Sequence, residues 1–525
     1  MDRAARIGLG VLGALSIAAF FAIAAVRLPC PIELGNGEGI LLDNAIRIAQ
    51  GKALYVAPSL EFVPFVYMPL FSTLVASLVR LFGPALWEGR LVELVGVAGF
   101  VAVALVVVRR ETRSWALALG GAGLFLMGEG LTRGGYDVIR PDGIMLMLAF
   151  AGLAVLRFTT TARGAVIAAL LTALGFFDKQ HGMLFGLAAI PWLALQDRRR
   201  FVPYTATFLA ATAGGYGLLT LWLGKWFPFY TWDVPSRWSE FSLERVLLYV
   251  GGVLLGKLAA LVVPSVLAAA VVRGRRDEPG SLWAWAALAG VGTGLMATLD
   301  AYAYYHTLIP TIAAFCVLAP VALDRLARRL DPGPGSRATA VAAVVLALQF
   351  VPLLYPMHTL LPRPGAEATR RDFVARLRAL PGRVLLPYHG YYLTAAGKGM
   401  SVSVLPLDDV VRAKGNRLLR EDPRYFDRLF DALRRGPGRP IVVNDSVLTK
   451  TGEASTPLWA SLDSSYRRAG DLGDLVERLR PLAGNRNSPT WIYVPTDPPA
   501  ARVAAPLAAR FAAPPAAQPA ARGGP

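Results

Sequence analysis

The most informative segment of this chain is ELGNGEGILLDNAIRIAQGKALY, which runs from Glu33 to Tyr55. It follows the first apolar run of membrane length and is the first long segment too polar for hydrocarbon. Apolar residues recur at helical spacing from Ile40 to Ala49, which predicts a short amphipathic helix lying along a membrane surface. Glu38 precedes this helix between two glycines, so its carboxylate can stay ionised and a ligand can approach it. The alternative is a solvated loop acid that caps the helix.

The composition excludes an ordinary soluble protein. The chain has 525 residues, of which 54% are hydrophobic and only 17% are charged. Several apolar runs reach the length that spans a bilayer as a helix. A closed barrel, the other spanning structure, would show alternating strands of about ten residues, and the sequence has no such pattern. We therefore predict a polytopic α-helical membrane protein.

Basic residues dominate the charge and give a formal net charge of +18. The arginines lie in short loops between apolar runs and form no basic face, which argues against nucleic-acid binding and indicates topology signals. The two cysteines, Cys30 and Cys316, provide neither a disulfide framework nor a metal motif. Arg3 and Arg6 precede the first apolar run, which has no clear cleavage site, so we expect a retained signal anchor.

The distribution of arginines sets the topology. Every second loop from residue 108 onward is basic and is expected on the cytoplasmic side. With the N-terminus also inside, one crossing must be missing between residues 66 and 108. We assign it to residues 67–83, a short run with Arg80 that would lie re-entrant or interfacial on the outer side. The prediction is about eleven crossings with the C-terminus outside; the alternative is about twelve, with the rule for basic loops broken.

The remaining loops then all face outside, on the side that carries Glu38. They are residues 131–141, 178–181, 225–245 and 300–306. Apart from the basic loops, nearly all polar residues at the membrane ends fall on this side. Charged side chains at the edge of hydrocarbon are costly and mark functional candidates by default. The clustering therefore predicts a site at the outer face of the bundle.

We divide the chain into three parts. Residues 1–357 form a transmembrane module whose first external loop is 28–66. In residues 358–497, short apolar segments typical of buried strands alternate with helical patterns, which predicts a small extracytoplasmic α/β domain. The strand-like segments are 383–387, 401–404, 440–443 and 490–494, and the clearest helical pattern is 425–435. Residues 498–525 are rich in alanine and proline and are predicted to form a disordered tail.

Two of the external loops hold charged residues that could act at a binding or catalytic site. In the first, Asp137, Arg140 and Asp142 precede an apolar run, where Asp142 could cap a helix and Arg140 could pair with either acid. In the second, Asp178-Lys179-Gln-His joins two apolar runs in a tight hairpin. Its lysine suits a lipid phosphate, or else snorkels to the surface. The loop 225–245 is rich in aromatic residues, which form an interfacial belt by default or a platform for sugars and polyprenyl chains.

In their order and spacing, these motifs resemble those of the GT-C glycosyltransferases, and within that class the bacterial protein O-mannosyltransferase-like and aminoarabinose-transferase-like enzymes. Four features in residues 1–360 carry the resemblance. They are Glu38 ahead of a helix ending Gly51-Lys-Ala-Leu-Tyr55; Phe65-Val-Tyr67-Met68-Pro69-Leu70, where the family has Tyr-x-Tyr-Pro-Pro-Leu; Arg140-Pro-Asp142, where relatives have Arg-x-Asp; and Asp178-Lys179-Gln180, like Thr-Lys-Gly or Thr-Lys-Gln. Met68 and Asp178 depart from the pattern. The acid lies in Gly-Glu-Gly where an Asp-Glu pair is commoner, so Glu33 remains a rival to Glu38.

The resemblance implies a glycosyltransferase of the bacterial inner membrane that moves a hexosyl or pentosyl group from a polyprenyl-phosphate donor to an extracytoplasmic acceptor. Glu38 is then the general base, and Arg140 and Lys179 stabilise the leaving phosphate. The residues expected to bind the sugar or the acceptor are Asp142, Asp137, Gln180 and His181. No cofactor is implied; a divalent metal is compatible with the clustered acids, but no ligand set requires one. The acceptor, whether glycan, lipid or protein, stays open, and nucleic acid is not expected.

Two other classes fit the same composition. A transporter would show polar or broken helices near the bilayer midplane and internal repeats. The sequence offers few midplane charges, Lys257 and Glu93, and no evident repeat. A non-catalytic anchor for the outer domain would hardly need so many helices. Flux without a transfer product would favour the transporter, and activity of residues 1–357 alone would argue against the anchor.

Overall fold

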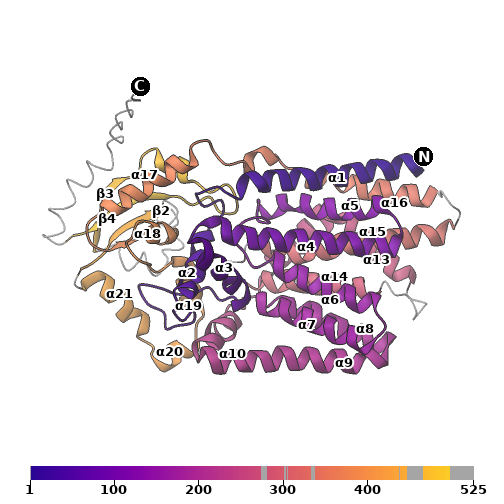
Figure 1. Cartoon of the computed structure of the whole chain (residues 1–525), viewed down its shortest axis with the longest axis horizontal. Helices are drawn as coiled ribbons and strands as arrows, with labels where there is room; N and C mark the ends of the chain where they lie inside the picture. The colour runs from indigo at the N-terminus through magenta and orange to yellow at the C-terminus, as the bar shows by residue number, and fades with distance from the viewer. Residues whose placement is uncertain are drawn as a thin grey trace.

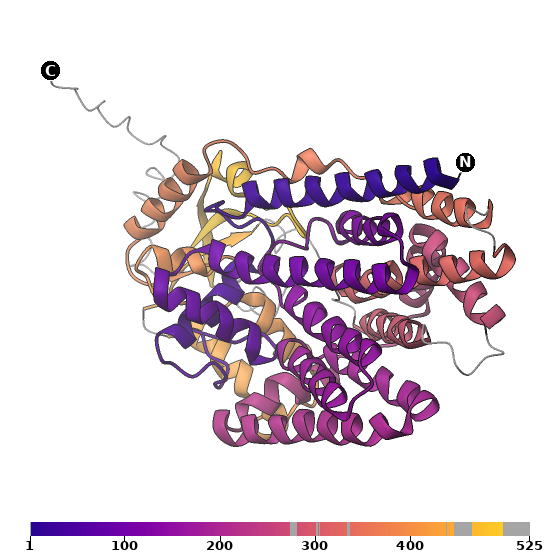
Figure 2. The ribbon, with the colours of Figure 1, turned by 45° about the vertical axis from the view of Figure 1, so that its right-hand side comes forward.

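The computed structural model describes residues 2–272, 281–300, 303, 305–332, 337–436, 438–445 and 465–496. The predicted tail from residue 498 lies outside these residues. Most of the described chain is helical, and the long helices run side by side along the longest axis of the molecule (Figure 1). A sheet with its own helices lies at the end of this bundle opposite the N-terminus, and it keeps that place in the turned view of Figure 2.

The helices of the bundle follow one another closely along the chain. Their bounds are α1 Asp2–Arg27, α4 Leu86–Thr112, α5 Trp115–Met127, η1 Gly128–Thr132, α6 Gly143–Phe158, α7 Ala162–Asp178, α8 Gly182–Gln196, α9 Arg198–Leu209, η2 Ala210–Gly214, α10 Gly215–Leu223, α12 Leu243–Leu247, η5 Leu248–Lys257, α13 Ala259–Val272, α14 Ser281–Thr298, α15 Ile309–Leu330 and α16 Arg337–Leu348. Short helical turns connect them, namely α11 Trp226–Pro228, η3 Phe229–Asp233, η4 Pro235–Arg237, η6 Tyr305–Leu308, η7 Val351–Leu353 and η8 Met357–Leu360.

By length and composition, five helices among the described residues can cross a membrane, or six if the bent pair Leu243–Lys257 and Ala259–Ala268 is one span. Shorter apolar helices such as α6 and α8 lie along the same bundle (Figure 1). The chain is thus a multi-pass helical membrane protein. The prediction of about eleven crossings goes beyond what this count tests and stays a prediction.

The basic loops meet at one end of the bundle. Glu111, at the end of α4, accepts hydrogen bonds from Arg157 at the end of α6 and from Arg325 near the end of α15. Arg328 donates to the main-chain carbonyl of Thr112 at 2.7 Å. The loops that hold Glu38, Arg140 and Lys179 lie at the opposite end, beside the sheet. The predicted separation of basic and other polar loops therefore appears in the fold.

Helices α2 (Glu38–Ala49) and α3 (Pro69–Phe82) lie at the sheet end and pack against each other. The guanidinium of Arg80 on α3 donates to the carbonyls of Ile48 and Ala49 at the end of α2. With 14 residues, α3 is shorter than the helices that pass the length criterion. This is the segment we assigned to the outer surface.

One expectation about α2 is wrong. An amphipathic helix on a membrane surface would expose its polar face, but every residue of α2 from Glu38 to Ile46 is buried. Of the predicted polar face, Asp43 is 5% exposed, Arg47 is half-buried, and Gln50, just after the helix, is exposed. The hydroxyl of Thr394 lies 3.4 Å from a carboxylate oxygen of Asp43, because a helix of the sheet segment covers this face.

Residues 366–496 form the sheet segment. Its bounds are α17 Ala366–Ala379, β1 Val384–Leu385, α18 Tyr391–Ala395, α19 Val404–Arg412, α20 Arg417–Glu421, α21 Tyr425–Arg435, β2 Ile441–Asp445, β3 Tyr466–Asp471, α24 Leu475–Leu479 and β4 Pro489–Pro495. The strand order is β1-β2-β4-β3, with β1 and β2 parallel and the other pairs antiparallel. The helix predicted at 425–435 is confirmed, whereas 401–404 is no strand and leads into α19.

The sheet segment shares its core with the loops of the bundle. One cluster of buried apolar side chains joins Leu42 of α2 and Ile139 of the 131–141 loop to Phe373 of α17 and Val443 of β2. A strand-like bridge connects Gly35 to Ala483. The boundaries predicted at 357 and 497 stay a prediction, but the part beyond 357 packs against the candidate site rather than hanging from a linker.

Candidate functional site

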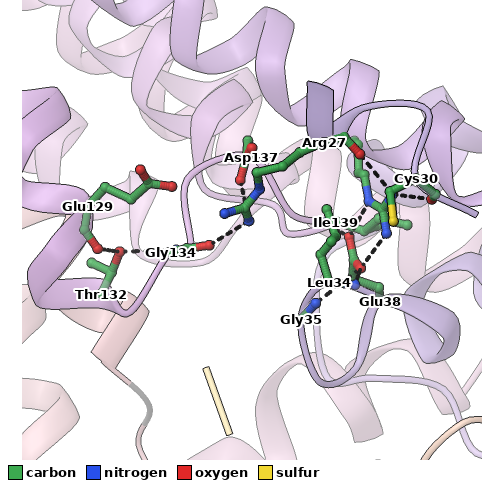
Figure 3. Close-up of polar contacts among 12 residues, drawn as sticks. Arg27, Cys30, Leu34, Gly35, Glu38, Glu129, Thr132, Gly134, Asp137 and Ile139 are labelled. Carbon is green, nitrogen blue, oxygen red and sulfur yellow. Dashed lines mark hydrogen bonds and ion pairs between the residues drawn. The ribbon is translucent and has the colours of Figure 1, made fainter. Parts of the chain in front are cut away.

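Glu38 lies in a closed cage of hydrogen bonds (Figure 3). Both carboxylate oxygens accept from the guanidinium of Arg90, each at 2.8 Å. One oxygen also accepts from the amides of Leu34 and Gly35, and the other from the amide of Ile139. Gly37, with φ of 92°, makes the sharp turn that brings the acid back onto the loop preceding it.

This cage determines what Glu38 can do. Burial alone raises the pKa of the Glu38 carboxyl, but the charge of Arg90 and the hydrogen bonds hold this pKa below its usual value. The residue is 1% exposed. It has neither a free oxygen nor an open face from which to take a proton from an acceptor. In this geometry Glu38 holds the loop in place, and its role as general base stays a prediction.

Asp137 also forms a buried ion pair with an arginine. Its carboxylate lies 2.7 Å from the guanidinium of Arg27, at the end of α1, and both side chains are buried. Arg27 also donates to the carbonyl of Gly134 (Figure 3). The nearby Glu129 accepts from the hydroxyl of Tyr355. This ion pair connects α1 to the 131–141 loop. The buried Asp137 carboxylate has no open face for the predicted contact with sugar.

Lys179 and Asp142 form a buried ion pair at the ends of α7 and α6. The ammonium lies 2.6 Å from the carboxylate, with side chains 3% and 1% exposed. The Asp142 side chain makes no capping hydrogen bond. Instead, a carboxylate oxygen of Glu93 on α4 accepts from the amide of Gly143, the first residue of α6, at 2.7 Å. Lys179 also lies over the ring of Tyr67, 5.7 Å from its centre.

Arg140 has a different partner from its neighbour Asp142. Its guanidinium lies 2.7 Å from Nδ1 of His306, next to a pocket lined by Gly35, Val138, Arg140, His306, Ala483 and Gly484. The pocket leaves about 10 Å³, about the volume of one water molecule. Two of its walls, Ala483 and Gly484, belong to the sheet segment.

The remaining predicted residues flank Lys179. The Gln180 amide donates to the carbonyls of Val66 and Thr231, at 2.6 and 3.3 Å, and so fastens the hairpin to two other loops. Nδ1 of His181 is buried and has no hydrogen-bond partner among the described residues. Burial first, and then the positive charges of Arg140 and Lys179, hold the pKa of His306 well below its usual value.

The predicted residues thus separate into two neighbouring groups. In one group Arg140 contacts His306, and Lys179 contacts Asp142 and Tyr67. In the other, Glu38 and Asp137 pair with Arg90 and Arg27. Among the described residues, Glu38 pairs with Arg90 whereas Lys179 pairs with Asp142. Of Glu38, Arg140, Asp142 and Lys179, only Arg140 lines the small pocket.

Sequence reasoning missed a second buried network at the same end. Nδ1 of His389 contacts a carboxylate oxygen of Glu33, and Nε2 lies 3.3 Å from a carboxylate oxygen of Asp445 on β2. Glu33 also accepts from the amide of Gly39 on α2. All three side chains are at most 2% exposed. Glu33, the rival of Glu38, is therefore also closed off.

The partners of these acids carried little signal in the sequence. Arg90 and Arg27 sit at the ends of apolar runs, where arginines are first of all topology signals. His389 follows a strand-like segment more than 350 positions from Glu33, as the 356-residue separation of the pair records. Among the described residues, no group of three or more His, Cys, Asp or Glu side chains is arranged to hold a metal ion.

Comparison with known proteins connects this geometry to a fold. The sequence matches no family model and no curated protein. Its structure is similar to that of ArnT from Cupriavidus metallidurans: the apo form has a TM-score of 0.58 with 15% identity over 94% of this chain and 98% of ArnT. The form bound to undecaprenyl phosphate has a TM-score of 0.57 with 14% identity over 91% and 97%.

A second solved structure is similar over most of the chain. The oligosaccharyltransferase AglB from Archaeoglobus fulgidus, in its apo form, has a TM-score of 0.52 with 12% identity over 86% of this chain and 73% of AglB. ArnT, an aminoarabinose transferase, and AglB are both GT-C glycosyltransferases. The chain therefore has the fold of the GT-C glycosyltransferases, as its motifs indicated.

Proposed function

We propose that this protein is a membrane glycosyltransferase that moves a sugar from a polyprenyl-phosphate-linked donor to an extracytoplasmic acceptor. The observation that carries the proposal is the presence of two cations from separate loops at one end of a GT-C fold: Arg140, which contacts His306, and Lys179, which pairs with Asp142 and lies over Tyr67. The structures of ArnT and AglB are known with undecaprenyl phosphate and dolichol-phosphate, respectively. Two cations at the membrane edge suit such a phosphate.

In this proposal Lys179 exchanges its present partner, the Asp142 carboxylate, for the donor phosphate. Its ammonium now pairs with Asp142 in a site that excludes water. A donor phosphate entering between Lys179 and Arg140 takes the place of this carboxylate and receives charge-assisted hydrogen bonds that strengthen as the phosphate leaves. Because the pocket at Arg140 has room for only one water, donor binding must also widen it.

In this mechanism Asp142, once released from Lys179, becomes the base that takes the acceptor proton. It is the carboxylate in direct contact with the phosphate-binding lysine, so release and activation occur together. Glu38 and Asp137 hold the loops in place through Arg90 and Arg27. His181, whose Nδ1 lacks a partner, is the remaining candidate for a hydrogen bond to sugar, while Gln180 positions the hairpin.

The proposal includes a bacterial inner membrane, a cytoplasmic N-terminus and a sheet segment outside the cytoplasm. The donor sugar is a hexose or a pentose, and the acceptor is a glycan, a lipid or a protein. The arrangement of basic loops at one end supports this orientation.

The first test is binding of undecaprenyl phosphate to the purified protein in nanodiscs. We expect K179Q and R140Q each to weaken binding at least tenfold, since each removes a charge-assisted contact of about 1.5–3 kcal/mol. K225Q is the matched control, because Lys225 is an exposed cation of another outer loop, over Trp226. Equal binding by K179Q, R140Q and K225Q would refute the phosphate site.

The second test is transfer from a panel of polyprenyl-phosphate sugars in the same nanodiscs. D142N is expected to bind undecaprenyl phosphate but to lose at least a hundredfold in transfer rate, the contribution typical of a general base. Full transfer by D142N would remove Asp142 from the mechanism and leave the phosphate site untouched.

One observation favours a transporter as the second candidate. The helix that begins at Leu243 breaks after Lys257, and its two halves meet at 88°. Broken helices within the membrane often form transport sites. Here, however, Gln349 of the α16 end donates to the carbonyl of Lys257 and accepts from the amide of Ala260, which closes the break. Flux of a sugar phosphate into sealed vesicles, without transfer, would favour this candidate.

A further inference from the structure

We propose that the basic end of the protein holds an anionic glycerophospholipid in a groove between α1 and α5, with the lipid phosphate on Arg3 and Arg6. This site is separate from the donor site, which lies at the opposite end of the bundle. Its occupant is a lipid of the leaflet that faces the basic loops. The inference does not depend on the proposed glycosyltransferase activity.

Contact distances along the two helices explain why a groove forms. At Gly13 the helices touch backbone to backbone, since an added Cβ would lie 2.2 Å from the carbonyl oxygen of Leu119. One turn earlier, at Gly10, a Cβ would lie 3.5 Å from the Cα of Ala116, which is an ordinary contact distance. The helices therefore separate toward their N-terminal ends and leave a wedge.

The wedge has the size and chemistry of an acyl-chain site. It is a shallow groove, largely open to its surroundings, with about 480 Å³ of space. Its walls are apolar, and Ile7 and Val11 remain 56% and 50% exposed. The floor consists of small residues, Gly10, Ala14 and Ala116. Among the residues that the structure describes, no side chain fills the wedge, which leaves it open to hydrocarbon from the bilayer.

Charge selects the occupant. Arg3 and Arg6 line the same groove at its open end. Trp115, the first residue of α5, is 59% exposed beside Ala116, and exposed tryptophans mark the level of lipid headgroups. A phosphate attached to a chain in the groove would therefore meet two guanidinium groups. A second copy of this chain would bring further arginines to this end, so an anionic lipid is the complementary partner.

The orientation is consistent with this occupant. The groove opens at the end where the arginine-rich loops gather, which by the rule for basic loops faces the cytoplasm. The cytoplasmic leaflet carries the anionic lipids, and each nearby Lys or Arg adds about fivefold to their binding.

The experiment is lipid retention by the full chain in native mass spectrometry, after exchange into detergent with phosphatidylglycerol or phosphatidylcholine. We expect retention of phosphatidylglycerol over phosphatidylcholine and a loss of roughly 25-fold in apparent affinity in R3Q/R6Q. R198Q/R199Q, which removes two exposed arginines at the same end, is the control and should retain phosphatidylglycerol fully.

A second variant separates lipid binding from topology, because Arg3 and Arg6 also orient the first helix. G10L keeps both arginines and fills the wedge, and it should lose the bound lipid as R3Q/R6Q does. The proposal is overturned if the wild type retains both lipids equally. It is also overturned if R3Q/R6Q and G10L retain phosphatidylglycerol like the wild type, or if R198Q/R199Q loses it to the same degree.

Discussion

Glu38 illustrates the energetics of a buried charge in this protein. Removing a carboxylate and a guanidinium from water costs several kcal/mol per ion. The attraction between Glu38 and Arg90 offsets this cost only because the remaining lone pairs accept from Leu34, Gly35 and Ile139. Such a pair is weak evidence for stability, but the loss of one partner leaves the other charged and unpaired.

We therefore expect E38Q to destabilise the protein. The substitution leaves Arg90 buried without a counter-charge, and breaking a buried pair in this way costs about 3–5 kcal/mol. Chemical unfolding in detergent, followed by tryptophan fluorescence, measures the change. E38Q/R90M, which removes both charges, should recover most of the loss, and E61Q, at an exposed acid of the same loop, should be neutral.

The two possible roles of Glu38 differ in this measurement. If E38Q unfolds like the wild type and loses only transfer, the residue is the base that the sequence predicted. If E38Q is destabilised and E38Q/R90M is not, the carboxylate acts through the loop.

At this scale the sequence identified the acids but not their partners. The polar residues of the 131–141 and 178–181 loops stood out because they interrupt apolar runs. The cations that neutralise Glu38 and Asp137 lie 52 and 110 positions away. A periodic pattern does not encode such pairings, so the burial of Glu38 could not be foreseen. Asp142 and Lys179 were both predicted as site residues, but their pairing across 37 positions was not.

Among the helices, the crossing of α4 and α6 positions the candidate site. Gly96 of α4 packs against the first turn of α6, where an added Cβ would lie 2.2 Å from the amide nitrogen of Ile144 and 2.3 Å from the carbonyl carbon of Gly143. This close approach lets Glu93, one turn earlier, accept from the amide of Gly143. Asp142 precedes that glycine, so the crossing also sets its position.

We expect G96A to destabilise the protein by about 1–3 kcal/mol, because backbone atoms cannot move aside as a flexible side chain can. The unfolding free energy in detergent is the measurement. G214A is the matched control: Gly214 lies in a helical segment with nothing within 4 Å of its Cβ position. A neutral result for G96A would show that the two helices can separate without loss.

A second prediction concerns the break between η5 and α13. Gln349 satisfies a carbonyl and an amide there, at 2.7 and 3.0 Å, and is 1% exposed. Q349L leaves both groups without their partner, at a cost of about 1–3 kcal/mol for each buried group. Thermal unfolding should show the loss, with Q50L, at an exposed glutamine ending α2, unchanged. An unchanged Q349L would mean that water or lipid headgroups reach the break.

The elements were predicted best where charge and periodicity agree. Counting arginines set 67–83 apart from the bundle, and α3 indeed packs on α2. The segment 401–404 shows the opposite case: alternating Ser and Val is typical of a strand, yet Val404 begins α19, whose Leu407 and Val410 fill the core against the 225–245 loop. Packing of a later helix face overrode the local pattern.

For the molecule as a whole, the main question is how the sheet segment attaches to the bundle. Its amides at Leu482 and Ala483 donate to the carbonyl of Leu34, at 2.9 and 2.7 Å. Arg412 of α19 pairs with Asp300 in the loop after α14. His389 contacts Glu33 from one side and Asp445 from the other. The sequence showed none of these contacts, because each joins segments far apart in the chain.

The charge of His389 makes this attachment depend on pH. Burial alone lowers the pKa of His389, which is about 6.5 in an unfolded chain. The charges of Glu33 and Asp445 outweigh burial and raise this pKa to about 10. A raised pKa contributes stability that is fully present below pH 6.5 and is lost as the pH rises through 10. Above that value two buried carboxylates share a neutral imidazole.

We therefore expect a protein with a protease site inserted between Pro364 and Gly365 to stay assembled after cleavage at pH 7 and to separate near pH 10. The shared core and the contacts at Leu34 hold the two fragments at neutral pH, and loss of the His389 proton weakens the buried network. Size-exclusion chromatography of the cleaved protein in detergent follows the separation. H389Q should separate already at pH 7, because it has no positive charge to offset the two carboxylates. H358Q, at an exposed histidine before the cleavage site, should behave like the parent. Fragments that separate at pH 7 without any substitution would show that the sheet segment is only tethered, and its walls at Ala483 and Gly484 would then play no part in the pocket.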